Sequence, residues 1–142
     1  MRVLVTGAYG RCGTALIDHL DDGGKHEFTY LNRSDRPEDH PYGNHDTYLA
    51  NVADYETMHP AFEGQDAVVH LAGHPSVDGP WPDILESNIV GMYNVLEAAR
   101  EHDVGTFVFA STNHVMGMYE AEFSPELYES GFDLTVDHTD PV

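Results

Sequence analysis

The sequence predicts an α/β fold with a doubly wound parallel sheet in strand order 3-2-1-4-5, and three observations support this prediction. Short apolar runs alternate with helical stretches from residue 3 to about residue 110. Strands separated by helices pair in parallel through right-handed crossovers. The first apolar run breaks into a turn with three glycines, Gly7, Gly10 and Gly13, before a helix begins. At 142 residues, the chain is expected to form one domain with its own core.

Apolar and helical segments alternate regularly in the first half of the chain. β-Branched runs predict strands, and the amphipathic pattern with Leu16, Ile17 and Leu20 predicts the first helix. Asp54 is placed to cap a short second helix. The stretch 32–46 is too polar to be core and is expected to be a loop. The expected strands are residues 3–6, 27–31 and 47–51, and the expected helices are residues 14–20 and 54–62.

The second half holds two strands around one long helix. Residues 67–71 form the clearest buried strand, and residues 106–110 form the fifth. Pro80-Trp81-Pro82 opens a helix that runs to about His102. A helical period of 3.6 residues predicts that one apolar face of this helix packs on the sheet: Leu85, Ile89, Met92, Leu96 and Ala99. From about residue 113 the chain is polar and is expected to be irregular, with one turn at residues 125–128.

The charge balance is strongly acidic, with 25 Asp and Glu against six Lys and Arg and a formal net charge of −19. Such a surface repels phosphate groups, which argues against nucleic acid and anionic membranes as partners. The acidic residues are scattered through the apolar pattern, so we expect a folded protein with a carboxylate-rich surface. This composition indicates adaptation to a salt-rich cytoplasm, where high ionic strength screens self-repulsion.

Cys12 is the single cysteine, which excludes an internal disulfide and suits a reducing compartment. The sequence shows neither a signal-peptide pattern nor a long apolar run, so we expect a cytoplasmic protein. Because Cys12 lies within the glycine turn, we interpret it as a small packing residue and not as a nucleophile.

The glycine turn is the strongest functional signal in the chain. Glycine lets the backbone adopt positive φ and lets an anion approach the main chain, and the following helix directs free N–H groups at that anion. A diphosphate-containing cofactor is the expected ligand. A mononucleotide-binding phosphate loop fits poorly, because it needs a Lys-Ser/Thr pair where this chain has Thr14 and Ala15.

The Thr6-Gly7-x-x-Gly10-x-x-Gly13 spacing resembles the opening of extended short-chain dehydrogenases, the NAD-dependent epimerase/dehydratase superfamily, which have a Rossmann-type sheet. The ligand of such a sheet lies at the carboxyl ends of the strands. The resemblance implies NAD as the cofactor, and Asn32 and Arg33 at the end of the second strand leave NADP open. The residues that it implies for cofactor binding are Gly7, Tyr9, Gly10, Arg11, Cys12, Gly13, Asn32, Arg33, Asn51, Val52, Leu71, Ala72, Gly73 and Asn88.

The segment Ser111-Thr112-Asn113-His114, together with Ser76, most resembles uronate dehydrogenases and haloarchaeal hexose-oxidising dehydrogenases. The resemblance implies that the Thr112 hydroxyl is catalytic and holds the reacting oxygen. It also implies that Ser76, Thr112, Asn113 and His114 contact a small sugar or sugar-acid substrate. Family members often dimerise through the long helix, so a homodimer stays open.

No metal site is expected. His70 and His74 are four residues apart, but they flank a strand end, and the sequence offers no third ligand near them.

The family's Tyr-x-x-x-Lys pair is not found in the sequence, whose single lysine is Lys25. We therefore expect residues 1–142 to be the N-terminal dinucleotide-binding domain of a longer enzyme and to be catalytically silent alone. Without a base near the operating pH, proton abstraction loses roughly two to four orders of magnitude in rate. The resemblance favours a sugar C1 dehydrogenase that gives a lactone. A nucleotide-sugar epimerase or dehydratase and a non-catalytic dinucleotide-binding module are the alternatives.

Overall fold

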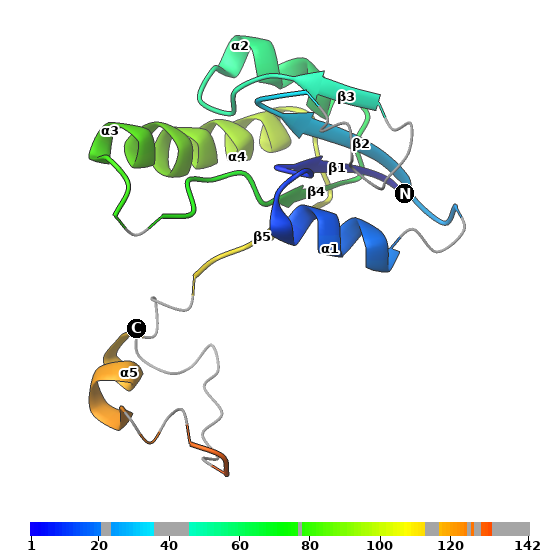
Figure 1. Ribbon diagram of the computed structural model, residues 1–142. Helices are drawn as coiled ribbons and strands as arrows, with labels where there is room; N and C mark the ends of the chain where they lie inside the picture. Colours follow the sequence, from blue (N-terminus) through cyan, green and yellow to red (C-terminus); the bar gives the residue numbers. More distant parts are fainter. Residues whose placement is uncertain are drawn as a thin grey trace. The chain divides into compact units, whose positions relative to one another are not determined.

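The computed structural model describes residues 1–20, 24–35, 46–76, 78–112, 117–124, 126 and 129–131. The chain divides into two compact units, Met1–Ala110 and Ser111–Val142. The first unit contains a five-stranded sheet in the order β3-β2-β1-β4-β5, with every neighbouring pair parallel (Figure 1). The predicted strand order is therefore confirmed. The strands are β1 (Arg2–Thr6), β2 (Glu27–Asn32), β3 (Asp46–Leu49), β4 (Ala67–His70) and β5 (Thr106–Phe109).

Helices cover both faces of the sheet (Figure 1). Because side chains alternate along a strand, Val3 and Val5 pack with Ile17 of α1 (Arg11–Leu20), whereas Leu4 packs with Val95 on the other face. That second face is covered by α2 (Tyr55–Met58), η1 (His59–Phe62) and a long helical segment. The long segment consists of α3 (Trp81–Ile84), the π-helical turn η2 (Leu85–Val90) and α4 (Gly91–Glu101).

The predicted sheet-facing stripe of the long helix is wrong for three of its five residues, whereas Ala99 is buried as predicted and Met92 is partly buried. Leu85, Ile89 and Leu96 are 38%, 56% and 43% exposed. The buried side of α4 consists of Ala99 together with four residues outside the predicted stripe, Gly91, Asn94, Val95 and Ala98. The helix approaches the segment after β3 so closely that a Cβ at Gly91 would lie 2.6 Å from Val52 Cγ2, and the absence of a side chain at Gly91 permits that approach.

Several helix boundaries differ from the predictions. Helix α1 begins at Arg11, three residues before the expected start, because Gly13 occupies its first turn without breaking it. Asp54 caps α2 as predicted, accepting a hydrogen bond from Thr57 N–H at 3.4 Å. The second unit is not wholly irregular, since α5 spans Gly117–Phe123 and contains good helix formers. The turn expected at residues 125–128 lies largely outside the described residues. Among the helices that are described, none combines the length and apolar character needed to cross a bilayer.

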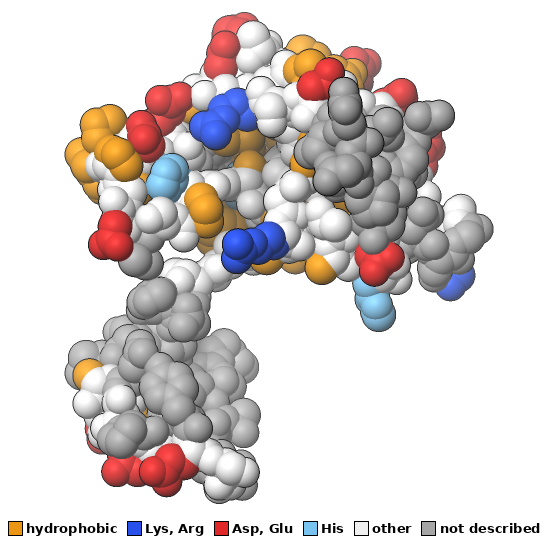
Figure 2. Space-filling view, in the orientation of Figure 1, with side chains coloured by type: hydrophobic (Ala, Val, Ile, Leu, Met, Phe, Trp, Pro, Cys, Tyr) orange, Lys and Arg blue, Asp and Glu red, His pale blue; other side chains and the backbone are white. Residues whose placement is uncertain are grey.

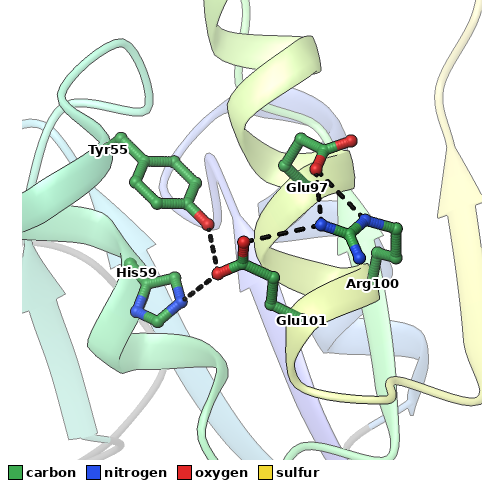
Figure 3. Close-up of polar contacts among 5 residues, drawn as sticks. All are labelled: Tyr55, His59, Glu97, Arg100 and Glu101. Carbon is green, nitrogen blue, oxygen red and sulfur yellow. Dashed lines mark hydrogen bonds and ion pairs between the residues drawn. The ribbon is translucent and has the colours of Figure 1, made fainter.

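A polar cluster joins α2 and η1 to the end of α4 (Figure 3). The Glu101 carboxylate accepts a hydrogen bond from Tyr55 Oη at 2.8 Å and lies 3.1 Å from His59 Nε2. Arg100 contacts the Glu97 carboxylate at 2.9 Å and Glu101 at 3.5 Å. These contacts tie α2 and η1 to the C-terminal end of α4.

Candidate functional site

The glycine turn packs closely against the segment that follows β4. Gly7 has φ +71°, and its N–H donates to the Leu31 carbonyl at 2.9 Å. A Cβ at Gly7 would lie 2.7 Å from Ala72 N, so a side chain there would force the two strand ends apart. A Cβ at Gly13 would overlap the Ala8 carbonyl, so the third glycine brings the helix close to the strand. Backbone, not side chain, therefore forms this surface.

Helix α1 presents free backbone donors beside this turn. Thr14 N–H donates to the Gly10 carbonyl at 2.9 Å, the first i to i−4 bond of the helix. The amides of Arg11, Cys12 and Gly13 precede that bond and so have no acceptor within the helix. Cys12 is exposed, so its interpretation as a packing residue is wrong. Donors at the positive end of a ten-residue helix suit a diphosphate.

A pocket of about 180 Å³ opens where the carboxyl ends of β1, β2, β3 and β4 meet. Such a position is the expected ligand site of a doubly wound sheet. Seven of the residues that the sequence implied for cofactor binding line it, together with five others. The lining is Gly7, Leu31, Asn32, Arg33, Ala50, Asn51, Val52, Ala72, Gly73, His74, Pro75 and Ser87.

Basic side chains lie beside this pocket although the chain is strongly acidic. Arg33 lines the pocket, and Arg11 begins α1. Figure 2 shows one face of the first unit hollowed, with basic side chains on two sides of the hollow and acidic side chains toward the outline of that unit. This distribution favours an anionic ligand.

Asn32 is fixed at the end of β2. Its Oδ1 accepts a hydrogen bond from Tyr9 N–H at 3.3 Å, and its buried Nδ2 has no partner among the described residues. Tyr9 does not line the pocket; its hydroxyl lies 2.6 Å from Thr47 Oγ1 and its ring meets Tyr30 edge-on. A buried amide donor without a partner is a costly feature that a ligand hydroxyl could relieve after a small shift of the side chain.

At the end of β3, a hydrogen-bonded link joins the strand to the helix layer. Asn51 Nδ2 donates to Glu86 Oε1 at 2.7 Å, and Asn51 Oδ1 accepts from Ala53 N–H at 3.1 Å. The neighbouring Val52 carbonyl accepts from the buried Asn94 Nδ2 at 3.0 Å. This end of the pocket is therefore held from two sides.

Thr6 and His70 form a buried pair between β1 and β4, where they are register partners. Thr6 Oγ1 accepts hydrogen bonds from Leu71 and Ala72 N–H at 3.3 and 3.2 Å, so its own proton is directed at His70 Nδ1, 2.6 Å away. Burial lowers the pKa of His70 to about 4, so the ring is neutral with its proton on Nε2. The pair fixes the backbone that follows β4, including pocket residues Ala72 and Gly73.

The loop after β4 is held by the π-helical turn. Asn88 Oδ1 accepts from His74 N–H at 2.6 Å, and Asn88 Nδ2 donates to the His74 carbonyl at 3.3 Å. The His74 ring accepts from Ser76 N–H at 3.4 Å and lies against Gly79, where a Cβ would be 2.7 Å from Nδ1. Ser76 Oγ accepts from Asp78 N–H at 3.2 Å. Asn88 thus supports the pocket wall through His74.

The remaining predicted site residues belong to the second unit. Thr112 is described and exposed, and its relation to the pocket stays a prediction. Asn113 and His114 lie outside the described residues. Among the described residues, no three His, Cys, Asp or Glu side chains are grouped as a metal site would require.

The sequence reasoning missed two contributions to the site. His74 and Pro75 line the pocket directly after the predicted Gly73, and only the loop position could have indicated them. Glu86 and Ser87 precede Asn88 on the helix. The π-helical turn, which rotates by less per residue than an α-helix, directs all three toward the strand ends.

The sequence profile of the NAD dependent epimerase/dehydratase family matches residues 3–133. The chain belongs to this family. A member from Haloferax volcanii, an NAD-dependent glucose-6-phosphate dehydrogenase, is 35% identical over 142 residues, covering 97% of this chain and 53% of that protein. An L-arabinose 1-dehydrogenase (NAD(P)(+)) from the same organism is 41% identical over 118 residues, covering 83% of this chain and 43% of that protein.

Solved structures of the epimerase/dehydratase family show the same fold. A uronate dehydrogenase from Agrobacterium tumefaciens in complex with NAD matches with a TM-score of 0.69 and 37% identity, covering 80% of this chain and 42% of that one. The chain spans about half or less of the length of these relatives. NAD is the cofactor of the family, and the bare backbone at Gly7, the α1 amides and the Asn32 amide fit that group.

Proposed function

We propose that this chain forms the dinucleotide-binding part of an NAD-dependent sugar dehydrogenase that oxidises C1 of a cyclic uronate or hexose to a lactone. The observation that carries the proposal is the pocket at the strand ends, which Gly7 and Arg33 line in a strongly acidic chain. Helix α1, whose first amides are free donors, begins at Arg11 soon after that glycine. The names of the relatives support the sugar class of the substrate.

The residues of the pocket would each hold a different part of the dinucleotide. The turn at Gly7 and the amides of Arg11 and Cys12 would bind the diphosphate. Asn32 would bind the adenosine ribose, where such folds commonly place a polar side chain. Ala72 and Gly73 would lie along the central part of the cofactor. When bound, NAD supplies the acceptor for the hydride that leaves C1.

Thr112 would hold the C1 hydroxyl while that hydroxyl loses its proton and C1 loses hydride, which leaves a C1 carbonyl, the lactone. Ser76, Asn113 and His114 would contact the other hydroxyls or the carboxylate of the sugar. The sequence contains no Tyr-x-x-x-Lys pair to accept the proton. Residues 1–142 alone should therefore bind NADH without turning over sugars.

Two measurements separate this function from its alternatives. The complete gene product, mixed with NAD and galacturonate, glucuronate, arabinose or glucose 6-phosphate, should release NADH with at least one of them. Turnover of nucleotide sugars and none of these would favour an epimerase or dehydratase, which the family also contains. NADH binding without turnover of either class would favour a non-catalytic module.

Arg33 suggests that NADP is also accepted. Asn32 carries no charge to repel a 2′-phosphate, and the exposed Arg33 guanidinium lines the same end of the pocket. In Arg33→Ala, the affinity for NADPH should fall about tenfold or more, the equivalent of one charge-assisted hydrogen bond, while that for NADH changes little. Equal losses for both cofactors would contradict this role.

A homodimer through the long helix is also proposed. Leu85, Ile89, Tyr93 and Leu96 are exposed and spaced by four, four and three residues, which places them along one side of the helix. An isologous pairing would bury this stripe against its copy. Ile89→Glu should then give a monomer in light-scattering chromatography at high salt, and a wild-type chain that is already monomeric would refute the pairing.

A further inference from the structure

The exposed carboxylate of Glu86 contacts Asn51, which lines the β3 end of the pocket, and the proposed function does not use it. Glu86 is held there by one oxygen, since Oε1 accepts from Asn51 Nδ2 at 2.7 Å. Within the described part of the chain, its other oxygen, Oε2, has no hydrogen-bond partner. Glu86 precedes Ser87, which itself lines the pocket. The link therefore keeps a hydrogen-bond acceptor at this end of the pocket.

Geometry indicates which part of a dinucleotide reaches Glu86. The diphosphate belongs at the turn after β1, and the adenosine ribose belongs at Asn32 after β2. The pocket continues from Asn32 to Asn51 and Val52 after β3, the next strand of the sheet and about 4.8 Å away. The base that the ribose carries would therefore lie at the β3 end, with its edge toward Asn51 and Glu86.

The wall that the base would meet is rigid and mostly apolar. Val52 is 6% exposed and contacts the backbone at Gly91, and its carbonyl is fixed by Asn94. Ala50 lies beside it in the pocket lining. A flat aromatic base packs well on such a surface, but apolar contact alone does not distinguish one purine from another.

We propose that Glu86, oriented by Asn51, selects a 6-aminopurine by accepting a hydrogen bond from its exocyclic amino group. The proposal rests on the proposed dinucleotide function and names the residue that reads the base. A carboxylate only accepts hydrogen bonds, so it pairs with the N6 amino group of adenine and faces the O6 oxygen of hypoxanthine as a second acceptor. Asn51 is less suited to this role, because its Nδ2 only donates and its Oδ1 already accepts from Ala53 N–H.

The test compares NADH with reduced nicotinamide hypoxanthine dinucleotide, which differs from NADH at that group. Both are titrated into the 142-residue chain by calorimetry at constant high salt. The variants are Glu86→Gln and, as a matched control with the same charge change, Glu56→Gln on the exposed side of α2. Circular dichroism of each variant establishes that it is folded.

Wild type and the control should bind NADH about ten to a hundred times more tightly than the hypoxanthine analogue, as expected for one charged hydrogen bond. In Glu86→Gln the ratio should fall to within about threefold, because an amide can accept from adenine or donate to hypoxanthine. An unchanged affinity ratio in Glu86→Gln, or no preference for NADH in wild type, would overturn the proposed role of Glu86 but leave the dinucleotide function standing. If wild type binds neither compound, the dinucleotide function fails as well.

Discussion

Replacing Thr6 by valine should destabilise the strand ends that build the pocket. Valine keeps the shape of threonine but removes Oγ1, which lies 2.6 Å from the buried His70 Nδ1 and accepts from Ala72 N–H at 3.2 Å. Leu71 N–H keeps a partner, because it also donates to the Thr6 carbonyl at 3.1 Å. Two groups therefore lose their partners, at about 1–3 kcal/mol each, and the part-buried Ala72 amide falls at the low end. We expect a loss of about 2–4 kcal/mol in the free energy of unfolding.

The assay is urea unfolding at constant high salt, followed by circular dichroism and by tyrosine fluorescence. A double-mutant cycle with His70→Phe isolates the pair, because phenylalanine keeps a ring between β1 and β4 and needs no hydrogen bond. The two substitutions should couple by about 1 kcal/mol or more, since the valine no longer leaves an imidazole nitrogen without a donor. Additive effects, or a Thr6→Val variant within about 0.5 kcal/mol of wild type, would refute the reasoning.

The same pair has a pH signature. Burial lowers the pKa of His70 from 6.5 to about 4, so between these values the unfolded chain binds a proton that the folded chain does not. The contribution of His70 to stability is therefore present above pH 6.5 and is lost as pH falls toward 4, at about 1.4 kcal/mol per pH unit. His70→Phe should remove this slope, and a slope equal to that of wild type would show that other groups cause it.

Three further outcomes follow from the structure. Gly7→Ala should lower the free energy of unfolding by about 1–3 kcal/mol and weaken NADH binding in calorimetry, because φ at Gly7 is +71° and the new methyl group would collide with Ala72. Unchanged NADH binding would contradict the role of the turn. Hydrogen bonds from Tyr55 and His59 hold the pKa of Glu101 below its usual range. The ionised Glu101 carboxylate therefore stabilises the folded chain at pH values above the usual pKa of a glutamate, and this stabilisation is lost as the pH falls through the lowered pKa. Glu101→Gln should therefore flatten the acid limb of the urea-unfolding profile, and an identical limb would exclude the cluster as its cause. With a net charge of −19, the chain should lose its circular dichroism signal as salt is removed, and full structure at low salt would refute halophilic adaptation.

The strand order and the glycine turn could be predicted because their signals are local. A β-branched run followed by closely spaced glycines specifies a buried strand and a tight turn within a dozen residues. The pairing of β1 with both β2 and β4 then follows from the handedness of the crossovers. The resemblance to extended short-chain dehydrogenases added Asn32, Asn51 and Ala72 as cofactor-binding residues, and all three line the pocket at the strand ends.

The side of the long helix that faces the sheet could not be predicted from the period of its apolar residues. Leu85, Ile89 and Leu96 have the right spacing for a buried stripe, but the side with Gly91 and Ala98 lies on the sheet. Close approach of a helix to a sheet selects small residues at the contact, and a π-helical turn shifts the phase before α4 begins. Hydrophobicity alone therefore identified the helix and misplaced its faces.

The link between Asn51 and Glu86 was equally beyond local reasoning, since 35 residues separate them. The carboxylate that contacts Asn51 belongs to the neighbouring π-helical turn. Only the fold brings this partner to the segment after β3.

The distribution of the few basic side chains connects the acidic surface with the proposed ligand. Among the described residues, Arg2 and Arg100 contact carboxylates, whereas Arg11 and Arg33, beside the pocket, form no ion pair. At about 1 M salt, the screening length falls to about 3 Å, so distant carboxylates neither repel an incoming dinucleotide nor neutralise these guanidinium groups. Only charges in contact with the phosphates then contribute to binding. The chain can therefore carry a large negative charge and still bind an anion, provided that high salt is present.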